Sequence, residues 1–205
     1  MTKHWTLGFL SAVVLFLGLT TLNAAEATGT TLDNLQAAFN GESNAKARYE
    51  AFALKADTEG YKGVASLFRA AADAEGIHAA KYAKQITKLK ATPTANTQTP
   101  DVKSTKENLQ AAIQGETYEA TTMYPAFVKQ AKLDKNKQAE KSFKGALAVE
   151  ADHAKLYQQA LDNLDSWKDA KTFIVCEVCG YTSMNMDLKQ CPICSAPRSK
   201  FDTIK

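Results

Sequence analysis

An internal repeat that carries paired glutamate and histidine residues restricts the fold of this chain more than any other feature. The segment NLQAAFNGES begins at Asn34, and the closely similar segment NLQAAIQGET begins at Asn108. The E-x-x-H sequence at 75–78 returns at 150–153, one position later than the first match requires, so one residue is inserted between the two matches. The two halves of the repeat are therefore expected to fold alike.

The composition of the two halves predicts helices. Residues 31–90 and 106–165 are rich in Ala, Leu, Lys, Glu and Gln, which favour helices, and the linker 91–105 is rich in Pro, Thr and Asn. Each half is predicted to form a two-helix hairpin, with turns near 60–63 and 133–137. Two hairpins joined by a long linker predict a four-helix bundle with one crossover, in a mainly α fold class.

Acidic and imidazole side chains occupy the core-facing stripe of each predicted helix. In 67–89 apolar residues recur at steps of three and four, and Glu75 and His78 fall in the middle of the series. The fourth helix places its own E-x-x-H pair in the same way. The seven polar residues on these stripes are Glu42, Glu75, His78, Glu116, Glu119, Glu150 and His153.

This combination predicts a dinuclear metal site. A single core histidine or glutamate usually has an ordinary structural explanation, but burying several ionised carboxylates costs on the order of several kcal/mol each unless cations compensate. One glutamate from each of two helices plus E-x-x-H from each of the other two is the ligand set of ferritin-like di-iron or di-manganese carboxylate bundles. Carboxylate oxygens with one nitrogen per metal favour iron or manganese over structural zinc.

The four cysteines predict a second metal site in a separate small module, residues 171–205. They lie in CEVCGY (176–181) and CPICSAP (191–197), two C-x-x-C knuckles separated by the segment 180–190. Four thiolates would hold one tetrahedral iron or zinc ion. Two disulfides are the alternative in an exported protein, and the paired knuckle spacing favours metal.

Residues 1–27 have the layout of a secretory signal peptide. Lys3 precedes an apolar run from Leu7 to Leu19, and small residues follow, with cleavage expected after Ala25 or Ala27. An uncleaved membrane anchor is the alternative, because the run is only slightly shorter than a membrane span. The formal net charge of +3 is near balance, which argues against a nucleic-acid partner.

The chain resembles the rubrerythrins. The resemblance covers nearly all of the sequence after the signal, from GES in the first helix through GETYEATTMYPAF in the third to CPICSAPRSKF near the C-terminus. It implies a ferritin-like di-iron bundle (28–168) followed by a rubredoxin-like β module (171–205). It also implies reduction of hydrogen peroxide to water, in protection against oxidative stress, with electrons relayed through a four-cysteine iron centre.

The resemblance also assigns roles to residues. It implies that the seven stripe residues are the di-iron ligands, that the extra carboxylate Glu119 exchanges with His78 on one iron as the oxidation state changes, and that Tyr49 and Tyr124 lie beside the site. Core packing is an equally good explanation for the two tyrosines. The residues implied to hold the mononuclear iron are Cys176, Cys179, Cys191 and Cys194.

Several expectations concern partners and alternatives. Family members associate head to tail, which predicts at least a homodimer in which the module of one subunit approaches the di-iron site of another. Export predicts a periplasmic electron donor such as a cytochrome or another small redox protein. Ser195 stands where the family commonly has a glycine, and the altered knuckle leaves zinc as an alternative metal there. A ferroxidase or iron-binding protein with a structural zinc module is the alternative function.

Overall fold

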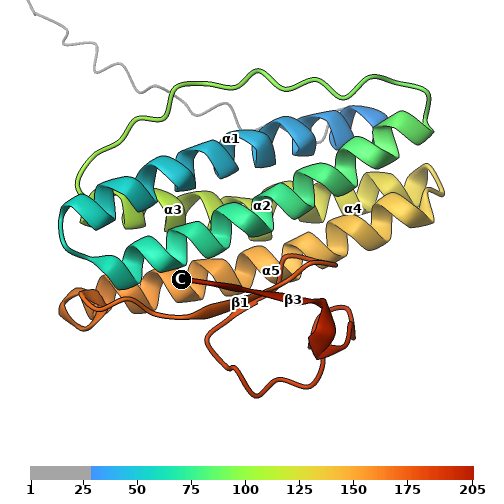
Figure 1. Cartoon of the computed structure of the whole chain (residues 1–205). Coiled ribbons are helices and arrows are strands. Elements are labelled where there is room, and N and C mark those ends of the chain that lie inside the picture. Colours follow the sequence, from blue (N-terminus) through green and yellow to red (C-terminus); the bar gives the residue numbers. More distant parts are fainter. Residues whose placement is uncertain (1–28) are drawn as a thin grey trace, which may run out of the picture.

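The computed structural model describes residues 29–205, and within them two helical hairpins pack as an antiparallel bundle (Figure 1). The predicted mainly α fold class is confirmed. The helical elements are α1 (Thr31–Thr58), α2 (Lys62–Lys88), α3 (Thr105–Tyr118), the π-helix η1 (Glu119–Met123), α4 (Tyr124–Leu133) and α5 (Lys137–Asp162). The segments α3, η1 and α4 follow one another without a break and together form the third long helix of the bundle.

Matching capping boxes start the first helix of each half. Thr30 precedes α1 and accepts a hydrogen bond from the backbone of Asp33, whose carboxylate accepts one from the backbone of Thr30. Ser104 and Glu107 form the same reciprocal pair at the start of α3. Such boxes satisfy N–H groups that have no partner inside a helix.

Each hairpin turn also supplies a carboxylate to the helix that begins the other half. The backbone N of Thr31 donates to Asp134 at 2.7 Å, and the backbone N of Thr105 donates to Glu59 at 2.7 Å. Asp134 and Glu59 follow α4 and α1, respectively, so they hold corresponding places in the repeat. The two halves are thus joined at both ends of the bundle.

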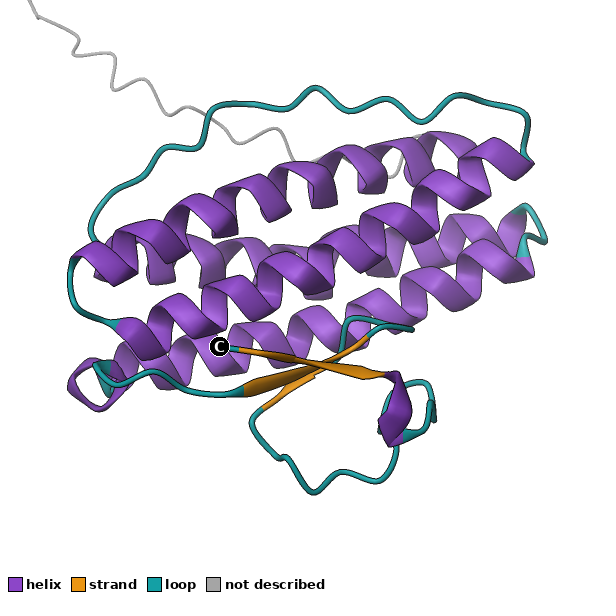
Figure 2. Cartoon of the chain, in the orientation of Figure 1, coloured by secondary structure: helices purple, strands orange, loops and turns teal. Residues whose placement is uncertain are grey.

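The linker between the halves runs along the outer face of α1 (Figure 2). Gln36, Asn40 and Asn44 lie at successive turns of α1, and their amides bond to backbone groups of 92–98. An amide at every fourth helical residue meets every second residue of an extended chain, because both steps cover similar lengths.

The C-terminal module is a small antiparallel sheet that lies against α2 and α5 (Figure 2). Its strand order is β2-β1-β3, and Val175 of the central strand pairs with Thr182 and Asp202. Val149 of α5 packs with the buried side chains of the module, including Ile174. Its elements, after the short helix η2 (Leu164–Trp167), are β1 (Phe173–Cys176), β2 (Thr182–Ser183), η3 (Arg198–Lys200) and β3 (Phe201–Ile204).

The predicted signal peptide, residues 1–27, lies outside the described residues. Among the residues that are described, no helix combines the length and the apolar character needed to cross a bilayer.

Candidate metal centres

Six of the seven predicted stripe residues meet at the middle of the bundle, and all six are buried. One group contains Glu42 from α1, Glu75 and His78 from α2, and Glu150 from α5, with candidate ligand atoms within 4.8 Å of one another. The second group consists of Glu75, Glu116, Glu150 and His153, whose candidate ligand atoms also lie within 4.8 Å of one another. Glu75 and Glu150 belong to both groups, so each carboxylate is placed to bridge two cations.

The two imidazoles point their Nδ1 atoms at the bridging carboxylates. His78 Nδ1 lies 3.1 Å from Glu75 Oε2 and 3.0 Å from Glu150 Oε1. His153 Nδ1 lies 3.1 Å from Glu150 Oε2 and 3.5 Å from Glu75 Oε1. Each half of the site therefore offers one nitrogen and several carboxylate oxygens.

Unpartnered atoms at this site show that its residues fit bound cations. Buried carboxylate oxygens of Glu42, Glu75 and Glu116 have no hydrogen-bond partner among the described residues, and the two oxygens of Glu150 face only the imidazole Nδ1 atoms. Buried polar groups are otherwise almost always paired. Hard oxygens with one nitrogen per metal suit iron or manganese.

Burial and neighbouring carboxylates raise the pKa of several groups in the cluster. Burial, together with the carboxylates of Glu119 and Glu75, raises the pKa of Glu42 well above its usual range. Burial alone would lower the pKa of His78, but Glu150 and Glu75 outweigh it and raise that pKa well above its usual range. Binding of cations would therefore release protons from this site.

The outer nitrogen of each imidazole is held by the cysteine module. His78 Nε2 donates to the carbonyl oxygen of Cys179 at 2.8 Å, which fixes the tautomer that leaves Nδ1 facing the carboxylates. His153 Nε2 lies 3.1 Å from Thr182 Oγ1, and that hydroxyl donates to the carbonyl of Gly180 at 3.0 Å. Since the hydroxyl proton of Thr182 is directed at Gly180, the Thr182 oxygen accepts from His153.

Gly180 makes the contact between His78 and the carbonyl of Cys179 sterically feasible. Its φ is +82°, and a Cβ there would lie 2.8 Å from His78 Nε2 and 3.2 Å from Ala74 Cβ. Glycine is the residue that accepts both this backbone conformation and so close an approach. The sequence motif CEVCGY contained Gly180, but its contact with a bundle histidine depends on how the module docks.

Tyr49 and Tyr124 lie beside the cluster and bond across the two halves. Tyr49 Oη donates to Glu116, and Tyr124 Oη donates to Glu42. Tyr82 Oη donates to Tyr124 Oη at 3.0 Å, so the contact between Tyr124 and Glu42 extends to a third tyrosine, which was not predicted as a site residue. Its only sequence signal is a place in the stripe one turn after His78.

Glu119, the seventh predicted ligand, lies next to the cluster but outside both groups of converging atoms. Burial, followed by the carboxylates of Glu150 and Glu75, raises the pKa of Glu119 well above its usual range. It is the first residue of the π-helix η1. Short π segments of this kind are frequent at functional sites.

The residue inserted in the second half of the repeat is accommodated by this π-helix. Glu42 corresponds to Glu116 at an offset of 74 residues. Tyr49 corresponds to Tyr124 at an offset of 75 residues. The extra residue therefore falls between Glu116 and Tyr124, where η1 lies. The wider turn brings the helix back into register, so that the two tyrosines hold equivalent places.

The four cysteines converge at the tip of the module. The Sγ atoms of Cys179 and Cys191 are 3.5 Å apart, and those of Cys176 and Cys194 are 3.7 Å apart. These distances are far too long for disulfides, and all four thiols are free. They are close to the edge of about 3.8 Å expected for a tetrahedron with metal–sulfur bonds of about 2.3 Å.

The residue after each knuckle has a left-handed backbone. Gly180 has φ +82° and Ser195 has φ +62°. The backbone N of each donates to the carbonyl of the first cysteine of its own knuckle, at 2.8 and 2.9 Å. Ser195, which stands where the family commonly has a glycine, thus adopts a positive φ in spite of its side chain.

The module reaches the carboxylate cluster of its own chain. The family resemblance predicts that the module of one subunit approaches the di-iron site of another. In the structure, the hydrogen bonds of Cys179 and Thr182 to the bundle histidines are formed within one chain, and the arrangement of subunits stays a prediction. The contact within one chain follows from the path of residues 163–172, which return from the end of α5 to the start of β1 along α2 (Figure 1).

The fold and the six converging ligands define a ferritin-like bundle with a carboxylate–histidine centre, joined to a rubredoxin-like four-cysteine module. The family model described as rubrerythrin matches residues 33–161, and the model described as the rubrerythrin rubredoxin-like domain matches residues 175–202. The chain belongs to the rubrerythrin family of di-iron proteins with a rubredoxin-like domain.

Individual relatives agree with this assignment. The chain is 39% identical to nigerythrin of Nitratidesulfovibrio vulgaris over 85% of its own length and 87% of the relative. It is 37% identical to rubrerythrin-2 of Clostridium acetobutylicum, over 83% and 95% of the two chains. A solved structure of mixed-valence nigerythrin superposes with a TM-score of 0.82 at 36% identity, covering 89% of this chain and 90% of that one. A bacterioferritin of Desulfovibrio desulfuricans, at 20% identity and a TM-score of 0.62, shares the bundle fold.

Proposed function

We propose that the protein is a non-haem di-iron peroxidase that reduces hydrogen peroxide to water with electrons delivered through a four-cysteine iron centre. The observation that carries this proposal is the hydrogen bond of 2.8 Å from His78 Nε2 to the carbonyl of Cys179. Cys179 thereby belongs to the four-cysteine site and also contacts His78, a candidate ligand in the bundle. A purely structural zinc module has no need of such a contact.

The geometry supports an assignment of residues to the two centres. Glu42 with His78, and Glu116 with His153, would each hold one iron, and Glu75 with Glu150 would bridge the pair. Two iron ions held there would act as Lewis acids toward peroxide and supply the two electrons that cleave its oxygen–oxygen bond. The four thiolates of Cys176, Cys179, Cys191 and Cys194 would hold the third iron.

Tyrosine hydroxyls place protons at the edge of the cluster. Burial and the neighbouring Glu42 carboxylate hold the pKa of Tyr124 well above its usual range, so its hydroxyl keeps its proton and donates to Glu42. Tyr82 donates to Tyr124 in turn. Reduction of peroxide to two waters consumes two protons with two electrons. The row of hydroxyls from Tyr82 through Tyr124 ends at Glu42, which would pass protons to peroxide at the di-iron site.

The location and partners of the protein are part of the proposal. Export through the signal predicted at 1–27 would put the enzyme in the periplasm, with membrane attachment only if that signal is not cleaved. The electron donor would then be a periplasmic cytochrome or another small redox protein. Assembly into a homodimer or a larger homo-oligomer is proposed from the family resemblance.

The test compares the anaerobically reduced, iron-loaded protein with peroxide and with oxygen as oxidants. We expect fast, stoichiometric consumption of peroxide and slow consumption of oxygen. The variant Glu75→Ala, which removes a bridging carboxylate, should lose di-iron content and peroxide consumption together. Oxidation of many equivalents of added ferrous iron, with ferric product accumulating on the protein, would instead support the ferroxidase alternative and contradict the peroxidase.

A further inference from the structure

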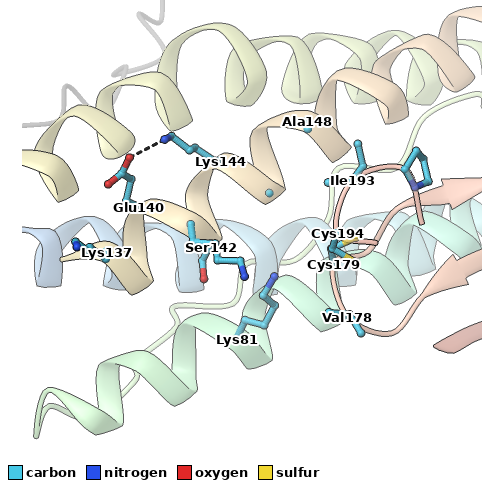
Figure 3. Close-up of a pocket in the computed structure, with 13 residues that line it drawn as sticks. Lys81, Lys137, Glu140, Ser142, Lys144, Ala148, Val178, Cys179, Ile193 and Cys194 are labelled. Atoms are coloured by element: carbon cyan, nitrogen blue, oxygen red, sulfur yellow. Dashed lines mark hydrogen bonds and ion pairs between the residues drawn. The ribbon is translucent and has the colours of Figure 1, made fainter. Parts of the chain in front are cut away.

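A groove of about 790 Å³ separates the cysteine knuckles from the bundle (Figure 3). One wall is the first half of α5, Lys81 of α2 projects into it, and the other wall is made by residues 178–179 and 192–194. The groove is distinct from the carboxylate cluster, which is fully buried. It is an open surface feature beside the four-cysteine site.

The knuckle wall of the groove contains the most exposed of the four cysteines. Cys176, Cys179 and Cys191 are at most 2% exposed, whereas Cys194 is partly exposed and lines the groove. Apolar side chains surround it: Val178 is 43% exposed, and Pro192 and Ile193 lie beside it. These apolar side chains would let another molecule approach Cys194 closely and would exclude water from the contact.

The bundle wall of the groove is strongly basic. Four lysines line it (Lys81, Lys137, Lys141 and Lys144), against one carboxylate, Glu140. Glu140 is paired with Lys144 at 2.6 Å. Lys137 and Lys141 are exposed and form no ion pair within residues 29–205, so this wall keeps an uncompensated positive charge, whereas burial lowers the pKa of Lys81.

We propose that the lysine-lined groove is the docking surface for the electron donor, and that this donor is an acidic one-electron carrier protein with its redox group near its surface. The proposal rests on the proposed function and adds the site and the charge of the partner. Oppositely charged surfaces accelerate encounter, and electron-transfer contacts are small and transient. Carboxylates of the partner would meet the lysines while its redox group faces Cys194.

The same wall continues inward to the carboxylate cluster. Cys179 lines the groove, and its carbonyl accepts the hydrogen bond from His78. In each encounter the donor would lose one electron, and an iron ion held by the four cysteines would gain it. Two encounters supply the two electrons that, with two protons, convert one hydrogen peroxide into two waters.

The test uses the iron-loaded full chain with two probes, flavodoxin as a small acidic carrier and a basic c-type cytochrome. The groove variant Lys137→Glu/Lys141→Glu is compared with Lys62→Glu/Lys106→Glu, which changes the net charge equally at the other end of the bundle. Lys62 and Lys137 are each the first residue of their helix, and all four lysines are exposed. Binding is measured by thermophoresis, and reduction of the cysteine site by its visible absorption.

We expect the groove variant to weaken flavodoxin binding and to slow reduction by about tenfold or more at about 10 mM salt, with the difference disappearing near 1 M. The control variant should stay within about twofold of the wild type, and the basic cytochrome should bind the wild type poorly. Equal losses in both variants would overturn the proposal, because overall charge alone would then explain binding. A change of sedimentation in the groove variant without a change in flavodoxin binding would also overturn it and would assign the groove to a second copy of the chain.

Failure of docking can be separated from failure of the proposed function. Dithionite reduces the protein without docking, and peroxide-driven reoxidation after this treatment tests the peroxidase by itself. If that reoxidation is fast while flavodoxin binds the two variants equally, the docking proposal is wrong and the peroxidase stands.

Discussion

Each imidazole of the buried cluster has its two nitrogens committed to different partners. The Nδ1 atoms face carboxylates, and the Nε2 atoms donate to Cys179 and Thr182 of the module. Outer hydrogen bonds of this type fix the orientation of a metal-binding histidine and strengthen it as a ligand. The module therefore contributes to the carboxylate site without supplying a ligand to it.

Thr182→Val should weaken the iron site, because it leaves the Nε2–H of His153 buried without an acceptor while keeping the shape of the side chain. We expect a loss of iron affinity of roughly 10- to 100-fold, measured by competition with a chelator. Thr182→Ser keeps the hydroxyl and should restore both the affinity and the spectrum of the di-iron site. Wild-type affinity in the valine variant would show that the 3.1 Å contact has no effect on the metal.

Glu119→Ala should retain two bridged iron ions but slow peroxide turnover. The six converging residues are left intact, whereas the anionic oxygen that ferric iron prefers is removed. Iron content and single-turnover rates are measured side by side, with Thr121→Ala in the same π-helix as the control, since Thr121 is exposed. An unchanged turnover rate would show that Glu119 does not take part in the reaction.

At the scale of elements, the two halves stabilise each other through their turns. Glu59 accepts from the backbone N of Thr105, and hydrogen bonds from Thr105 and then Lys55 lower the pKa of Glu59 to about 2. The carboxylate lies at the N-terminus of α3, where negative charge is favourable. Because the folded pKa is depressed, this stabilisation is present above the ordinary pKa of 4.5 and is lost as the pH falls toward 2.

Glu59→Gln should therefore lower the free energy of unfolding by about 1 kcal/mol at neutral pH and have little effect near pH 2. Urea unfolding of the metal-free wild type and variant at several pH values measures this difference. Glu50→Gln, whose exposed ion pair with Lys46 is worth little, is the control. A difference between wild type and Glu59→Gln that does not change with pH would contradict the assigned role.

The helices were predictable from the sequence because their pattern repeats. The two turns and the six converging residues follow from helical spacing and from the correspondence of the two halves, whereas the capping boxes at Thr30 and Ser104 were not predicted. The π-helix was not predicted, although the extra residue between Glu116 and Tyr124 marks its place. Spacing shows that a residue is inserted, but whether a loop or a widened turn absorbs it depends on packing around the site.

At the scale of the whole molecule, the position of the cysteine module decides whether the two metal centres communicate. Both sites could be identified from ligand spacing. Their contact through Cys179, Gly180 and Thr182 could not, because it depends on the docking of two domains that share no sequence pattern. The one sequence signal is Gly180, which permits the approach of the knuckle to His78.

Gly180→Ala, studied at saturating iron so that both centres are occupied in spite of weaker outer hydrogen bonds, should separate the two centres. The new Cβ would lie 2.8 Å from His78 Nε2 and would push the knuckle away from the bundle. Gly60→Ala is a matched control, since Gly60 has the same φ of +82° and no atom within 4 Å of its Cβ position. Both variants should lose about 1 to 2 kcal/mol of stability from backbone strain, and only Gly180→Ala should slow electron transfer between the centres. Equal transfer rates in the two variants would show that the contact at His78 is not the route.

The most direct test of the central claim is stopped-flow spectroscopy of the iron-loaded, fully reduced wild-type protein. The visible charge-transfer band of the oxidised four-cysteine iron is followed after mixing with hydrogen peroxide and, separately, with oxygen. If electrons pass from that iron through the Cys179–His78 contact to the carboxylate cluster, the band should return rapidly with peroxide and slowly with oxygen. A di-iron site that oxidises while the four-cysteine iron stays reduced would contradict the account.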